Sequence, residues 1–67
     1  MSVARVTEIS STSSQSFEDA VKQGIARSAK TLRGVSGAWI KEQNVVVENG
    51  AITTYKVNLL ITFVLDD

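Results

Sequence analysis

The last third of the chain alternates apolar and polar residues after a tight turn signal, and this pattern restricts the fold more than any other. Over residues 51–65, one parity carries Tyr55, Val57, Leu59, Ile61, Phe63 and Leu65. The other parity is more polar, although it includes Leu60 and Val64. Alternation with a period of two is typical of a strand with one buried face. Asn49-Gly50 precedes this strand, and because both residues tolerate positive φ, they predict a two-residue hairpin turn from a strand over 37–47.

The segment before the hairpin predicts a helix. Apolar and small residues recur there at three- and four-residue spacing: Phe17, Ala20, Val21, Gly24, Ile25, Ala29 and Leu32. This spacing indicates an amphipathic helix over about 15–33. Glu18 and Asp19 in its first turn suit the helix dipole, and Gly34 fits a left-handed C-cap. Glu18 also lies four residues before Lys22, which is the spacing of a helical ion pair.

The N-terminal segment, Val3 to Ile9, is rich in β-branched residues and predicts a first strand. The hydroxyl-rich residues 10–14 predict a turn and a helix cap. The order of elements is therefore β-α-β-β, and we expect an α+β fold in which a three-stranded antiparallel sheet packs on one long helix. At 67 residues the chain has room for a single domain, residues 1–67.

Such a sheet has one face that the helix does not cover. The odd-numbered side of the last strand is the expected bed for the helix, together with Ala38 and Ile40 of the strand before it. The uncovered side is expected to carry Gly37, Trp39, Lys41, Gln43, Val45, Leu60 and Val64. Exposed apolar faces of this kind usually mark an interaction site, and a small domain without cysteine has no disulfide to stabilise it. We therefore expect a homo-oligomer.

Several functional classes are disfavoured by composition. The absence of histidine and cysteine excludes Ser-His and Cys-His nucleophile pairs, so an enzyme is not expected. Seven basic and seven acidic residues balance without a basic stripe, which disfavours nucleic-acid binding. No apolar stretch approaches the roughly 20 residues of a membrane span, and without an export signal a cytoplasmic location is expected. The acidic residues lack the spacing of a calcium loop, so no metal site is predicted: Glu8, Glu42, Glu48, Asp66 and Asp67.

Trp39, the single tryptophan, has two interpretations. It could anchor a subunit interface, where aromatic side chains carry much of the burial energy. Alternatively it could stack on a flat heteroaromatic ligand, with Lys56 or Gln43 supplying polar contacts. Residue types alone favour the interface anchor, because interface aromatics are the commoner case.

Several short segments, in order, extend over nearly the whole chain. They are Val6-Thr7-Glu8-Ile9 followed by Ser-Thr-Ser, Ser16-Phe17-Glu18-Asp19-Ala20, the run from Ile25 to Arg33, Tyr55-Lys56-Val57, and Thr62-Phe63-Val64-Leu65-Asp66. In order, spacing and total length this pattern resembles the dodecins, small flavin-binding proteins of β-α-β-β fold that assemble into hollow homododecamers. The resemblance implies a flavin-storage protein that binds riboflavin or FMN at subunit interfaces.

The resemblance also implies positions for the flavin contacts. In dodecins a tryptophan on the strand after the helix stacks on the isoalloxazine, and a glutamine directly after a tyrosine hydrogen-bonds it. Aligned without gaps from Thr31, these positions are Gly37 and Lys56, and Trp39 follows two residues later on the same face. The implied flavin-binding residues are thus Trp39, Lys56, Gln43 and Gly37. Other dodecins are associated with calcium or coenzyme A, so an assembly with another ligand or a structural role is the alternative.

Overall fold

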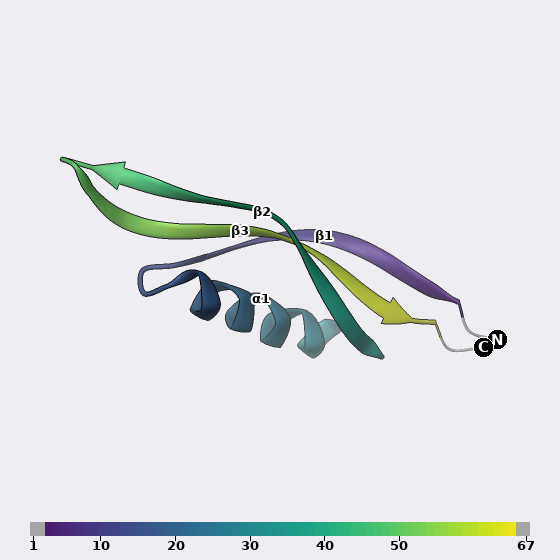
Figure 1. Cartoon of the computed structure of the whole chain (residues 1–67). Helices are drawn as coiled ribbons and strands as arrows, with labels where there is room; N and C mark the ends of the chain where they lie inside the picture. The colour runs from purple at the N-terminus through teal and green to yellow at the C-terminus, as the bar shows by residue number, and fades with distance from the viewer. Residues whose placement is uncertain (1–2, 66–67) are drawn as a thin grey trace.

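A computed structural model describes residues 3–65 and confirms the predicted β-α-β-β order (Figure 1). The elements are β1 (Ala4–Ser13), α1 (Phe17–Thr31), β2 (Val35–Glu48) and β3 (Ala51–Val64). The three strands form one antiparallel sheet in the order β1-β3-β2, and α1 lies along one face of it. The α+β fold predicted from the sequence is therefore correct, with the last strand at the centre of the sheet.

The hairpin turn forms as predicted, whereas Gly34 is not the C-cap: the C-cap of α1 is Leu32, which has an extended backbone and lies two residues before Gly34. Asn49 and Gly50 both have positive φ, 52° and 77°, as the two-residue hairpin requires. Gly34 follows α1 with a φ of 73°, and a Cβ added there would lie 2.9 Å from the carbonyl oxygen of Val64. Glycine is therefore needed at this position both for the left-handed backbone and for the close approach to β3.

The helix is slightly shorter than predicted at both ends. Its N-cap is Ser16, whose extended backbone stops the helix and whose hydroxyl accepts a hydrogen bond of 3.0 Å from the Asp19 N–H. The predicted ion pair between Glu18 and Lys22 is present at 3.4 Å. These local interactions fix where α1 begins on the sheet.

The hydroxyl-rich segment was assigned wrongly to a turn. Residues 10–13 continue β1 and pair with β3, from Ser10 opposite Asn58 to Ser13 opposite Tyr55. The last of them still serves the turn, because the Ser13 hydroxyl donates to Asp19 Oδ2 at 2.6 Å and accepts from the Gln15 N–H at 2.9 Å. Cross-strand pairing thus extends the strand through residues whose local preference is for turns.

The core lies between α1 and the predicted odd-numbered side of β3. Val57, Leu59 and Ile61 are fully buried there, together with Ala20 of the helix. Gly24 lets the helix approach closely, since a Cβ on it would lie 3.0 Å from Leu59 Cδ1 and about as near to β1. The bed of the helix was therefore predicted correctly.

The hairpin of β2 and β3 extends past the N-terminal end of α1, and the molecule measures 51 × 19 × 13 Å (Figure 1). Phe17, the first residue of α1, meets Tyr55 edge-on with ring centroids 5.1 Å apart. Residues 45–54 lie beyond this contact, and we call them the hairpin arm. The arm exposes four large apolar side chains: Val45, Val46, Val47 and Ile52.

Candidate functional site

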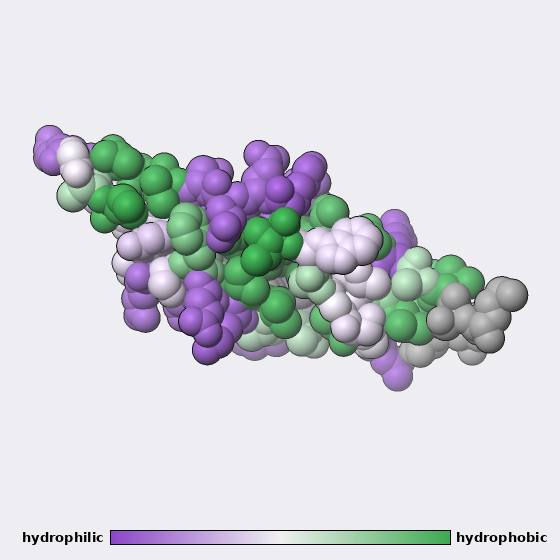
Figure 2. All heavy atoms as spheres, viewed as in Figure 1, coloured by the Kyte–Doolittle hydropathy of each residue, from purple (hydrophilic) through white to green (hydrophobic). Residues whose placement is uncertain are grey.

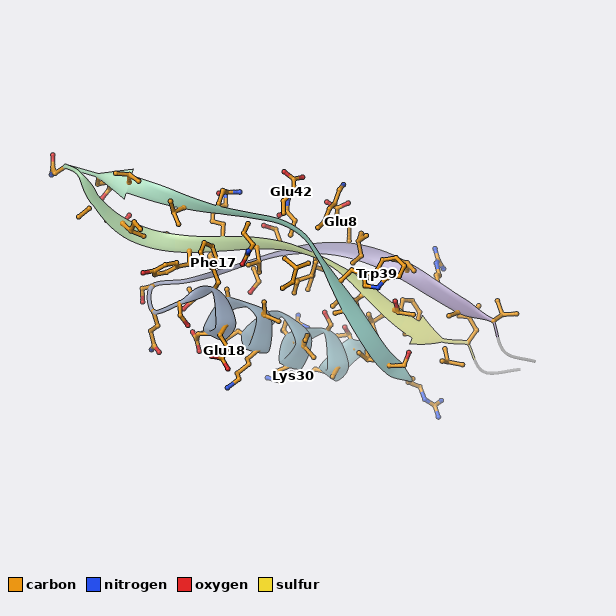
Figure 3. All side chains as sticks on the ribbon, in the orientation of Figure 1. Glu8, Phe17, Glu18, Lys30, Trp39 and Glu42 are labelled. Atoms are coloured by element: carbon orange, nitrogen blue, oxygen red, sulfur yellow. The ribbon has the colours of Figure 1, made fainter. Side chains whose placement is uncertain are left out.

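The sheet face opposite α1, here called the helix-free face, holds the most prominent candidate residue. Side chains of directly opposed residues in an antiparallel pair share one face of the sheet. Trp39 is opposite Leu60, whose neighbours Leu59 and Ile61 point into the core, so the indole lies on the helix-free face. Figure 3 shows Trp39 with Glu8 and Glu42 on the side of the sheet away from Glu18 and Lys30 of the helix. The side chain of Trp39 is 65% exposed, which leaves it available for a ligand or another subunit.

The surroundings of Trp39 are flat and partly apolar. Gly37 is opposite Thr62 on the same face, and a Cβ added to it would meet nothing within 4 Å. Val6 on β1 is also opposite Thr62 and is exposed. The indole therefore stands beside open space that a planar group could enter. Val6 was not predicted to be part of this surface, because only the strand pairing brings it there.

An ion pair between β1 and β2 lies next to Trp39. Lys41 Nζ lies 3.1 Å from Glu8 Oε1, and each side chain is about half exposed. Glu8 is opposite Leu60 from β1, just as Trp39 is from β2, so the ion pair crosses the central strand next to the indole. This contact between residues 33 positions apart in the sequence was not predicted.

Lys56 shares the helix-free face but is not close to Trp39. It is opposite Asn44, four residues along β3 from the partner of Trp39, which corresponds to about 13 Å along the strand. Trp39 and Lys56 of one chain are therefore too far apart to contact the same small aromatic ligand. Trp39 of one copy and Lys56 of a second copy could contact it together.

Gln43 lies on the wrong side of the sheet for the predicted site. The pairing of β2 with β3 shifts between Ile40 and Glu42, and the extra residue reverses the alternation after it. Gln43 is consequently opposite Val57, which is buried beneath α1. The expectation that it shares a face with Trp39 is wrong for this reason, and the same shift moves Val45 to the helix side. Ile40 is on the helix side as predicted, yet it is 52% exposed because α1 packs mainly on β1 and β3.

The described residues hold no ready-made metal centre. Residues 3–65 contain no group of three or more histidine, cysteine, aspartate or glutamate side chains that could hold an ion. Asp66 and Asp67, considered above with the other acidic residues, lie outside the described residues. In the same part of the chain no helix is long and apolar enough to cross a membrane.

The family model described as Dodecin matches residues 3–66. The chain belongs to the dodecin family. Its fold is similar to a dodecin from Streptomyces davaonensis, with a TM-score of 0.93 and 29% identity over 98% of this chain and 97% of that one. A mutant of the Thermus thermophilus dodecin matches with a TM-score of 0.94 and 28% identity over the whole of both chains.

A third similar structure is a calcium dodecin from Mycobacterium tuberculosis, described as having a novel calcium-binding site. It matches with a TM-score of 0.80 and 31% identity over 91% of this chain and 87% of that one. No curated protein matches the chain. The dodecin fold is thus shared with a protein whose description names calcium as its ligand.

Proposed function

We infer that this dodecin is a non-enzymatic binding protein that forms a homo-oligomer and stores flavin, riboflavin or FMN, against Trp39. The observation that carries this inference is the exposed indole on the helix-free face, beside the open space at Gly37. An isoalloxazine is flat and apolar over much of its surface, and offset stacking on an aromatic ring of this kind stabilises such a ligand. The family resemblance supplies the identity of the ligand.

The site requires more than one copy of the chain. A single chain offers one flat surface, whereas ligand sites usually bury most of the ligand. A second copy placed on the helix-free face would cover the other side of the ring, and it could bring its own Lys56 to the flavin from the far end of its β3. The exposed apolar residues of the helix-free face and of the hairpin arm favour such an assembly. The resemblance to dodecins implies twelve copies, and we propose the cytoplasm as their location.

The test is a flavin titration of the purified, ligand-stripped oligomer, followed by the loss of flavin fluorescence. We expect saturable quenching in the unmodified protein, and Trp39→Ala should weaken binding by about tenfold or more because stacking is worth about 1–3 kcal/mol. Trp39→Phe keeps an aromatic ring and should retain part of the affinity. Lys22→Ala, on the exposed side of α1, is the control and should change nothing.

The mass of each variant in solution separates the two roles of Trp39. Weaker flavin binding at unchanged mass supports the stacking role. Loss of the oligomer in Trp39→Ala, with no quenching by the intact unmodified protein, would instead establish the interface anchor and a structural assembly. Calcium and coenzyme A would then be titrated into the same protein as the alternative ligands.

A further inference from the structure

We propose that the groove between α1 and β1 binds the phosphate group of a small phosphorylated molecule. The groove has a volume of about 760 Å³, which is within the range of sites for small molecules. It lies on the helix side of the sheet, so it is separate from the helix-free face and from Trp39. The proposal does not depend on flavin binding.

The walls of the groove follow from the periods of the two elements. Gln23, Arg27 and Thr31 recur every four residues and therefore form one rim along α1. Thr7, Ile9 and Ser11 alternate on the helix side of β1 and form the opposite wall. The floor between them contains Gly24 and Ser28, which are both buried and small. At Gly24 itself the helix lies close to Leu59 and to Ser11 of β1, so the groove opens between the longer rim residues and β1.

Arg27 places one positive charge at this hollow. None of the residues that line the groove is acidic. The two carboxylates of α1 are engaged elsewhere, Glu18 with Lys22 and Asp19 with Ser13 and Gln23. Within residues 3–65 the guanidinium of Arg27 has no ion-pair or hydrogen-bond partner. Its five N–H donors are therefore available to an anion in the groove.

Neutral donors line the same groove. Thr31 is one helical turn after Arg27, and its hydroxyl makes only a long contact of 3.4 Å with the Ser28 carbonyl oxygen. Thr7 contributes a second hydroxyl from β1. β1 is also an edge strand of the described sheet, so its outer backbone N–H groups have no strand partner. Ser11 is not counted among these donors, because its hydroxyl donates to the Ala20 carbonyl oxygen at 2.7 Å.

This combination fits phosphate better than a simple carboxylate. A guanidinium binds two oxygens of a phosphate group in a planar, bidentate manner, and the remaining oxygen needs further donors such as hydroxyl or backbone N–H groups. The apolar side chains of Ile9 and Leu32 line the same groove and can contact the organic part of the molecule. Since only one cation is present, the affinity is expected to be modest.

The experiment is a calorimetric titration of the full chain with inorganic phosphate and with glycerol 3-phosphate, at constant ionic strength. Arg27→Gln should weaken binding of both by about tenfold or more, because hydrogen bonds to a charged group contribute about 1.5–3 kcal/mol. Lys30→Gln is the matched control. It removes the same charge from the same helix, but Lys30 does not line the groove and points away from the sheet (Figure 3). Thr7→Val should cause a smaller loss.

Each alternative outcome has a definite meaning. Equal weakening by Arg27→Gln and Lys30→Gln would overturn the proposal, because it would indicate attraction to the overall charge of the helix. Acetate binding as tightly as phosphate would overturn the choice of phosphate. No saturable binding by the unmodified oligomer would also overturn it. Helix content and subunit number are measured for every variant, so that a folding defect is not mistaken for a loss of the site.

Discussion

Val57, Leu59 and Ile61 are fully buried beneath α1, whereas Val47 and Ile52, further along the same hairpin, are more than half exposed. Both groups are large β-branched or aliphatic residues on well-formed strands. The difference is the helix, which ends its cover at the contact between Phe17 and Tyr55. Within one subunit, the apolar residues of the hairpin are buried only where α1 covers the sheet, over β1 and β3. Figure 2 shows the apolar residues of the hairpin arm gathered at the surface at one end of the molecule.

The largest expected effect comes from a matched pair of truncations in the two regions. Leu59→Ala should lower the free energy of unfolding by about 2–5 kcal/mol, because it leaves a cavity in the core. Val47→Ala should cost less than about 0.5 kcal/mol in the isolated subunit, as for other exposed positions. Urea denaturation over a range of protein concentrations measures both.

Concentration dependence then distinguishes folding from assembly. The loss in Leu59→Ala should be similar at all concentrations, whereas any loss in Val47→Ala should grow as the oligomer forms. A large, concentration-independent loss in Val47→Ala would show that the arm is packed within its own subunit. The division between the two regions would then be wrong.

A second pair of variants compares two glycines, and its effect is smaller. Gly24→Ala should destabilise the protein by about 1 kcal/mol, since overpacking against Leu59 and Ser11 outweighs the gain in helix propensity. Gly37→Ala meets no atom within 4 Å and should stabilise the isolated subunit by about 0.5 kcal/mol. Thermal melting of both variants checks the opposite signs. Destabilisation by Gly37→Ala in the oligomer alone would reveal a neighbouring copy against the helix-free face.

The sequence predicted several elements whose signals are local, although at residues 10–13 strand pairing overrides the local preference for a turn. The turn at Asn49-Gly50, the N-terminal half of α1 and the alternation around Leu59 each depend on residues within a few positions of one another, and each was predicted correctly. The position of Gln43 was not, because the shift between Ile40 and Glu42 is set by the pairing of two strands. One extra residue in β2 has no signature in β2 itself.

The candidate site was predictable only in part. Trp39 was placed on the correct face because it precedes the shift in pairing. Its neighbours Val6 and Glu8 come from β1, and no pattern within β2 could have named them. The groove beside α1 was missed because it results from the helix lying over β1 and β3. The four-residue spacing of Gln23, Arg27 and Thr31 is visible in the sequence. It indicates one edge of a groove only when the position of β1, which forms the opposite wall, is known.

The smallest expected effect concerns the ion pair between Glu8 of β1 and Lys41 of β2, which crosses β3. A double-mutant cycle with Glu8→Gln and Lys41→Gln should give a coupling free energy of about 0.5 kcal/mol or less, falling with added salt, because both side chains are about half exposed. The helical pair of Glu18 and Lys22 is more exposed and should couple still more weakly. A coupling well above 1 kcal/mol that persists at high salt would mean that the ion pair is desolvated in the oligomer. Since Glu8 and Trp39 flank the same residue of β3, that result would place a second copy directly over the indole, where the flavin site requires it.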